Sequence, residues 1–226
     1  MSCNSIQGLA TGGLLLAATL AVAAPAEGGV TAIETKGSLT VSVASSPTNV
    51  FSFNATEVGE GVIDGDGGLG GWGSFSISST GPSFVASATT SGIGDEAASF
   101  DMQAGLIFGA LTETRLSISY DSIEGSTGAL AALYLFNLST GEPVDENDPI
   151  WVLDAPTVNG AWTVDVQASA PGFAYLIGYG DTWDTPSGST SSGGLSVTFT
   201  EIPAPGAFAG LGAMGLLGAC GRRRRG

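Results

Sequence analysis

The chain of 226 residues contains no histidine. This absence removes the commonest general base and the commonest transition-metal ligand. It also excludes Ser-His-Asp and Cys-His arrangements for nucleophilic catalysis. The two cysteines, Cys3 and Cys220, lie near the chain ends, which excludes zinc sites built from thiolates in the rest of the sequence. An enzyme built on this chain would therefore depend on carboxylates.

Basic residues are almost missing from the middle of the chain. Between residues 27 and 201 only Lys36 and Arg115 are basic, whereas all 21 acidic residues lie there, giving this part a formal charge of −19. A field of that sign repels nucleic acid and anionic lipid headgroups and attracts cations. The sequence therefore predicts no nucleic-acid partner, and membrane contact only through the terminal segments.

The C-terminus combines a proline motif, an apolar run and a basic cluster. The 20 residues from Ile202 to Gly221 would reach about 30 Å as a helix, roughly one hydrocarbon thickness. The arginines that follow are costly to move across a bilayer and are expected to stay cytoplasmic. The residues of the motif and the cluster are Ile202, Pro203, Ala204, Pro205, Gly206, Arg222, Arg223, Arg224 and Arg225.

This three-part tail resembles a PEP-CTERM sorting signal, which is also described as an ice-binding protein C-terminal domain. The family's central Pro-Glu-Pro is Pro203-Ala204-Pro205 here, without the acidic residue. The resemblance is limited to residues 202–226. It implies cutting near the proline motif by an exosortase, in the inner membrane of a Gram-negative-type bacterium that makes extracellular polysaccharide. An uncut tail anchor is the alternative.

The N-terminus resembles a secretory signal peptide. Leu9 to Ala23 is apolar, and small-residue cleavage sites end at Ala23 and at Ala26. Signal peptidase is therefore expected to cut after Ala23 or Ala26, with an uncut N-terminal anchor as the alternative. The predicted organisation is a signal helix over 1–26, an exported domain over 27–201 and a sorting tail with a hydrophobic helix over 202–226.

Apolar residues alternate with polar residues along most of residues 30–200, which is typical of half-buried strands. Alternating sets are Leu39–Val43, Phe75–Ile77, Leu116–Tyr120, Trp162–Val166 and Leu195–Phe199. More continuous apolar runs, of the kind buried on both faces, include Val50–Phe53, Phe84–Ala88, Ala98–Met102, Ala129–Leu138, Ile150–Leu153 and Phe173–Tyr179. Turn formers such as Asn159-Gly160 and Pro171-Gly172 separate them and favour hairpins. The pattern predicts an all-β fold, an antiparallel β-sandwich that is jelly-roll-like.

Carboxylate pairs can hydrolyse glycosides when they lie ~5–9.5 Å apart. The candidates are Asp95, Glu96, Asp181 and Asp184. They lie beside turn glycines and prolines, where solvated acids are common, so the sequence favours a protein that is not an enzyme.

Calcium is the cation that the acidic loops would suit, because it takes six to eight oxygen ligands. Asp64 and Asp66 have an i, i+2 spacing in a glycine-rich loop, and Asp145 and Asp148 enclose a run of oxygen-bearing side chains before Pro149. Two solvated acidic turns are the favoured interpretation, and calcium binding is the hypothesis set against it. No cofactor other than calcium is predicted.

Exposed tryptophans could stack on sugar rings. Trp183 is expected outside a strand between Asp181 and Asp184, and Trp72 lies in the glycine-rich loop over residues 59–73. For Trp183 a position as a lid on the core is favoured over this role.

These observations lead to three hypotheses. The first is an exported protein of the cell envelope or extracellular matrix, with a structural or adhesive role linked to exopolysaccharide. The second is a lectin-like carbohydrate-binding module, with or without calcium, and the third is a carboxylate glycosidase.

Overall fold

The computed structural model describes residues 29–43, 46–65, 73–80, 83–92, 95–153 and 159–203. The described part contains strands, turns and bridges but no helix, and every ladder between its strands is antiparallel. The all-β, antiparallel prediction is confirmed. The predicted terminal helices lie outside the described residues.

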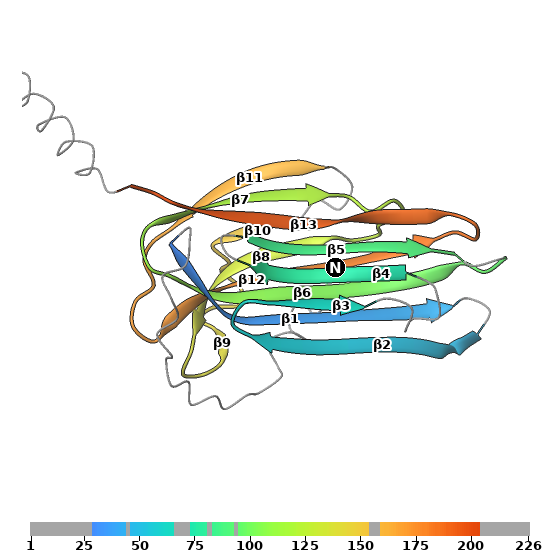
Figure 1. Ribbon diagram of the computed structural model, residues 1–226, viewed down its shortest axis with the longest axis horizontal. Coiled ribbons are helices and arrows are strands. Elements are labelled where there is room, and N and C mark those ends of the chain that lie inside the picture. The colour runs from blue at the N-terminus through green and yellow to red at the C-terminus, as the bar shows by residue number, and fades with distance from the viewer. Residues whose placement is uncertain are drawn as a thin grey trace, which may run out of the picture.

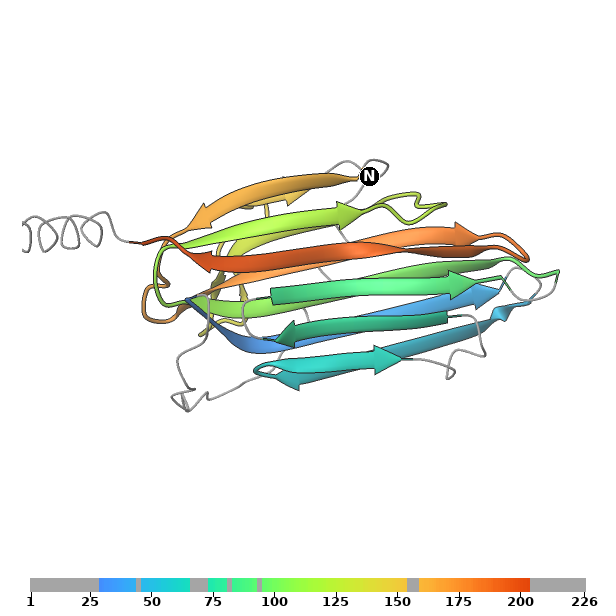
Figure 2. The same ribbon diagram turned by 45° about the horizontal axis from the view of Figure 1, so that its top comes forward.

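Two sheets form the fold (Figures 1 and 2). Sheet A has the spatial order β10 (Trp151–Leu153), β8 (Leu130–Asn137), β12 (Phe173–Thr185), β6 (Ala98–Ala110), β1 (Val30–Val43) and β2 (Ser46–Val58), and the short β9 (Glu142–Pro143) pairs with β8. Sheet B has the order β11 (Gly160–Val166), β7 (Thr114–Asp121), β13 (Thr190–Glu201), β5 (Ser83–Ser91), β4 (Gly73–Thr80) and β3 (Gly61–Gly65).

The core lies between the two sheets because alternate residues of each strand face inward. In β7 buried and exposed residues alternate without exception, and Leu116, Ile118 and Tyr120 are the apolar buried ones. β1 and β13 contribute Leu39, Val41 and Val197, none of which is exposed. Burying a side chain of this size contributes about 1.5–3 kcal/mol, so the alternation that predicts the strands also supplies much of the stability.

The centre of sheet A is buried on both faces. In β12 every residue from Ala174 to Asp181 is buried, and in β6 every residue from Ala104 to Phe108 is. Strands covered on both faces read as continuous apolar runs instead of alternating ones. The prediction of such a strand over Phe173–Tyr179 is therefore confirmed.

Two parts of the strand prediction are wrong. β3 lies inside the glycine-rich stretch over 59–73 that was expected to be a loop, and β12 continues through Thr185, beyond the predicted end at Tyr179. β12 pairs with β6 over eleven residues, from Tyr175 opposite Phe108 to Thr185 opposite Ala98. This long ladder outweighs the poor strand propensity of glycine and aspartate in that part of β12.

Candidate functional site

The outer face of sheet B carries a regular array of hydroxyl groups, because Ser and Thr alternate with the buried apolar residues. We call this surface the hydroxyl face. Its members are Ser74, Ser76, Ser78, Ser83, Ser87, Thr89, Ser117, Ser119, Thr163, Ser192, Ser196 and Thr198. The strand register aligns them in rows across the sheet, one of which joins Thr163, Ser117, Thr198 and Ser83.

One row of the hydroxyl face runs from one carboxylate to another. Asp64 of β3 lies opposite Ser76, Ser76 opposite Ser87, Ser87 opposite Gly194, and Gly194 opposite Asp121 of β7. Both aspartates are exposed. Neutral hydroxyls thus occupy the middle of the row and negative charges its two ends.

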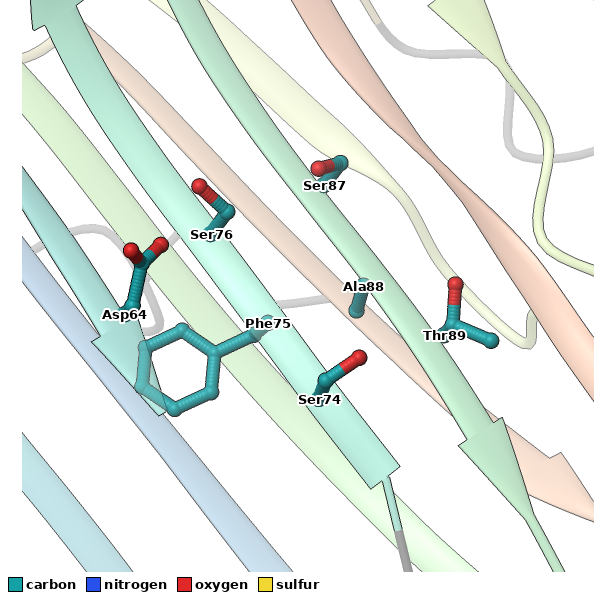
Figure 3. Close-up of a pocket in the computed structure, with 7 residues that line it drawn as sticks. All are labelled: Asp64, Ser74, Phe75, Ser76, Ser87, Ala88 and Thr89. Atoms are coloured by element: carbon teal, nitrogen blue, oxygen red, sulfur yellow. The ribbon is translucent and has the colours of Figure 1, made fainter. Parts of the chain in front are cut away.

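Two adjoining hollows follow this row. The first, of about 380 Å³, is lined by Asp64, Ser74, Ser76, Ser87 and Thr89, which come from three neighbouring strands (Figure 3). The second, of about 240 Å³, shares Ser87 and Thr89 and extends to Ser119, Asp121 and Ser196. Together they form one shallow trough across β3, β4, β5, β13 and β7.

Gly194 keeps the middle of the trough free of a side chain. Its φ is +152°, and a Cβ placed there would lie 2.0 Å from the carbonyl oxygen of Ala86. Only glycine fits this backbone without displacing β5.

The chemistry of the trough suits a neutral polyol. A hydroxyl can donate one hydrogen bond and accept two, so Ser and Thr match the hydroxyls of a sugar in either direction, and an exposed carboxylate accepts from them. Charged side chains of the hydroxyl face lie near its borders, at Asp64, Asp121 and the Arg115–Asp165 ion pair. The hydrogen bonds from Arg115 lower the pKa of the Asp165 carboxyl.

A third hollow, of about 250 Å³, lies on the outer face of sheet A and contains Asp101 and Asp184. Thr40, Ser42, Thr127 and Thr182 also line it. Asp101 lies opposite Thr182, and Asp184 opposite Ser99, so the two aspartates are diagonal neighbours with Cα atoms about 7–8 Å apart. Burial raises the pKa of Asp101, whereas Asp184 is exposed and accepts a hydrogen bond from Ser99 Oγ at 2.5 Å.

Two of the candidate acids, Asp181 and Asp184, do not share a face of the sheet. They lie three residues apart in β12, and a strand places such residues on opposite faces. Asp184 points outward, whereas Asp181 is 1% exposed in the core. Asp101, which sequence reasoning did not single out, is the acid that shares the face of Asp184. Only the pairing of β6 with β12 shows that Asp101 and Asp184 lie close together. Asp95 and Glu96, the other candidates, are exposed just before β6.

Asp181 belongs to a buried polar cluster instead. Its Oδ2 accepts hydrogen bonds from the hydroxyls of Tyr120 at 3.2 Å and Tyr179 at 3.1 Å, and its Oδ1 accepts from Ser126 at 2.7 Å. Burial raises the pKa of Asp181, and burial beside this carboxylate raises the pKa values of both tyrosines.

The favoured core position of Trp183 is confirmed, whereas the expectation that it lies outside a strand is wrong. Trp183 lies inside β12, is 1% exposed, and stacks on Phe100 with ring centroids 5.4 Å apart. Its indole N–H donates to Thr90 Oγ1 at 2.8 Å. The side chain points inward because it is two residues from Asp181, so neither ring face is open to a sugar.

The other predicted site residues either are exposed in a loop or lie outside the described residues. Asp145 and Asp148 are exposed in the connection between β9 and β10, where Asp145 Oδ1 accepts a hydrogen bond from the backbone N–H of Asn147 at 2.8 Å. Among the described residues, no three His, Cys, Asp or Glu side chains converge as a metal site would need. Calcium binding stays a prediction. Trp72, Asp66, Ala23 and Ala26 lie outside the described residues.

Of the sorting motif, Ile202 and Pro203 lie within the described part. Ile202 follows β13 and donates its backbone N–H to the carbonyl of Glu113 at 2.8 Å. Residues 204–226, with the arginine cluster, lie outside it. No helix in the described ranges has the length and hydrophobicity needed to cross a membrane.

No protein-family model and no curated protein matches this chain. Among solved structures, it is similar to the enzymatically active domain of bacteriophage CBA120 tailspike protein 4, at 15% identity and a TM-score of 0.28 over 73% of this chain and 19% of that one. A GH31 alpha-xylosidase from Xanthomonas citri gives 10% identity and a TM-score of 0.23 over 78% and 18%. The chain spans about a fifth of the length of either structure, and scores this low support no functional argument.

Proposed function

We propose that this chain is an exported structural or adhesive protein of the cell envelope or extracellular matrix, which contacts neutral exopolysaccharide through its hydroxyl face. The terminal segments support export and sorting, because they resemble a signal peptide and a PEP-CTERM tail. A jelly-roll-like strand order and processing by signal peptidase and an exosortase are part of the proposal. Intact mass of the extracellular form would report both cuts.

The observation that carries the polysaccharide contact is the row from Asp64 through Ser76, Ser87 and Gly194 to Asp121. The row offers both hydrogen-bond donors and hydrogen-bond acceptors, and it lies along a shallow, open trough. A neutral glycan is favoured because the formal charge of −19 over residues 27–201 repels an anionic one.

Co-sedimentation with dextran, a neutral β-glucan and anionic alginate tests the contact. The chain is expected to bind a neutral polymer and to bind alginate more weakly, with the difference shrinking at high salt. The double variant S87E/S196E puts two charges in the trough and is expected to weaken binding at least tenfold. Thr56→Glu in exposed β2 is the matched control. Equal binding by S87E/S196E and the wild type would remove the hydroxyl face from this role.

A second candidate function, glycoside hydrolysis, is favoured by the Asp101–Asp184 pair. Paired carboxylates need different protonation states, one to donate a proton and one to act as base or nucleophile. Burial keeps Asp101 protonated to higher pH, so it would be the acid, and the exposed Asp184 would be the base or nucleophile. Release of reducing sugar that is lost in both Asp101→Asn and Asp184→Asn, but kept in Asp121→Asn, would support this function over a purely structural one.

A further inference from the structure

The strand β2 forms an edge of sheet A, and one side of its backbone has no partner among the described strands. β2 pairs with β1 only, and it is the outermost strand of that sheet in Figure 1. Its regular ladder with β1 runs from Val50 to Val58, since the register shifts just beyond Ser42, the partner of Val50. Asn54 is therefore the middle residue of the regular part.

The direction of the free backbone groups follows from one hydrogen bond. Gly59, just after β2, donates its N–H to the carbonyl of Ile33 in β1 at 2.8 Å. In an antiparallel ladder, residues bonded to the neighbouring strand alternate with residues whose N–H and C=O point the other way. The odd-numbered residues of β2 therefore bond to β1. Ser52, Asn54 and Thr56 direct their N–H and C=O groups toward the free edge.

This edge lacks the features that normally keep a free strand from pairing with another chain. Such edges are usually short, or carry charges, proline or a bulge. The other edge strands in the described part follow that rule, since β9 and β10 have two and three residues and β3 and β11 contain Asp64 and Asp165. β2 has 13 residues, and no charge or proline lies between Thr48 and Thr56. β2 is therefore the edge that is open to a further strand.

A second copy of β2 suits this edge. Antiparallel pairing with Asn54 opposite Asn54 of the second copy brings Ser52 opposite Thr56, and such hydroxyl pairs across a ladder are favourable. It also brings Val50 opposite Val58. Val58 is 69% exposed, the highest value among the large apolar residues of the described part, and the pairing gives it an apolar neighbour.

The same arrangement keeps the charges of the two strands apart. Glu57 is the one charged residue between Thr48 and Val58, and it would lie opposite Phe51 of the second copy. The two Glu57 residues are then six positions apart along the joined strands, or about 20 Å. That separation exceeds the screening length of about 8 Å at physiological salt, so the two carboxylates barely repel each other.

We propose that two copies of this chain associate through β2, antiparallel and centred on Asn54, so that their A sheets form one continuous sheet. Paired residues of neighbouring strands point to the same face, which places the B sheets of both copies on the same side. Both hydroxyl faces are then directed the same way and can contact one polymer together. This consequence rests on the proposed function, whereas the pairing itself does not, and its tests use no glycan.

Disulfide crosslinking of the full chain tests the pairing and its register. In a C3S/C220S background, Asn54→Cys brings the two substituted positions to a Cα separation of about 5.5 Å, which suits a disulfide. Ser52→Cys is the matched control, because Ser52 is also exposed but its two copies would lie four positions, or about 13 Å, apart. Asn54→Cys is expected to give about ten times more linked dimer than Ser52→Cys. Equal yields from the two variants would overturn the proposal.

Sedimentation equilibrium of the full chain provides the second measurement. Asn54→Pro removes an N–H that points to the second copy and leaves the ladder with β1 complete, so the dissociation constant of the dimer is expected to rise about tenfold or more. Asn54→Thr keeps this N–H and is the matched control. Because both copies are acidic, added salt is expected to tighten the dimer.

Two results of the sedimentation experiment would overturn the proposal. One is a chain that stays monomeric at all concentrations and salt levels. The other is association that is undiminished in Asn54→Pro, since this variant keeps the terminal segments of the unsubstituted chain and the contact would then lie away from β2.

Discussion

The hydroxyl of Tyr120 in β7 donates a hydrogen bond across the core to Asp181 in β12, at 3.2 Å. This contact joins sheet B to sheet A through a buried carboxylate that also accepts from Tyr179 and Ser126. Three hydroxyl donors therefore stabilise the buried Asp181 carboxylate.

Tyr120→Phe is expected to lower the free energy of unfolding by about 1–3 kcal/mol, because it leaves a buried carboxylate short of one donor. Urea unfolding at pH 7 measures this loss. Tyr175→Phe is the control, since Tyr175 donates to the neutral carbonyl of Gln167 and its loss is expected to be smaller. In the double variant with Tyr179→Phe, the two losses are expected not to add, because both hydroxyls share Asp181 Oδ2. Strict additivity would show that the cluster does not act as a unit.

Alkaline pH is expected to destabilise the protein through the same cluster. Burial raises the pKa values of Tyr120 and Tyr179 above their ordinary value, which is about 10. The unfolded chain then loses its tyrosine protons first, so their contribution is complete below about pH 10 and is lost as the pH rises further. Melting temperatures between pH 8 and 12 measure the decline. The variant Y120F/Y179F is expected to show a shallower decline, and an unchanged slope would contradict the assignment.

Gly194→Ala is expected to destabilise the fold by about 2–4 kcal/mol, through backbone strain and overpacking against β5. The added Cβ would lie 2.0 Å from the Ala86 carbonyl oxygen, at a φ of +152°. Gly109→Ala in β6 is the matched control, because no atom lies within 4 Å of its Cβ position, and its effect is expected to stay within about 1 kcal/mol. Equal melting temperatures for the two variants would show that the trough tolerates a side chain at Gly194.

Trp183→Ala is expected to cost about 3–5 kcal/mol by leaving a cavity in the core. The ring stacks on Phe100 and anchors Thr90, and Thr90 Oγ1 is also 2.9 Å from Thr185 Oγ1. Chemical denaturation measures the loss, while polysaccharide binding by the folded fraction is expected to stay unchanged. A variant that keeps its stability but loses glycan binding would contradict the core role and favour a sugar-binding role for Trp183.

The candidate site was only partly predictable. Asp64 and Asp184 stand out in the sequence, but the residues that lie beside them across the strands could not be predicted from it. Asp64 faces Ser76, and Asp184 shares a hollow with Asp101. Trp183 was misplaced because the glycines and aspartates around it favour turns, whereas pairing with β6 keeps the segment extended.

The sequence alone determined where most strands lie and which of their side chains face the core. Alternation along Leu116–Tyr120 or Leu195–Phe199 is a local property, since successive side chains of a strand point to opposite faces. Only the tertiary structure decided which strands are neighbours, and so that Ser87 lies between Ser76 and Gly194, or Asp101 near Asp184. Those neighbours are remote in the chain, and they are selected by the burial of whole sheet faces, which no short stretch of sequence encodes.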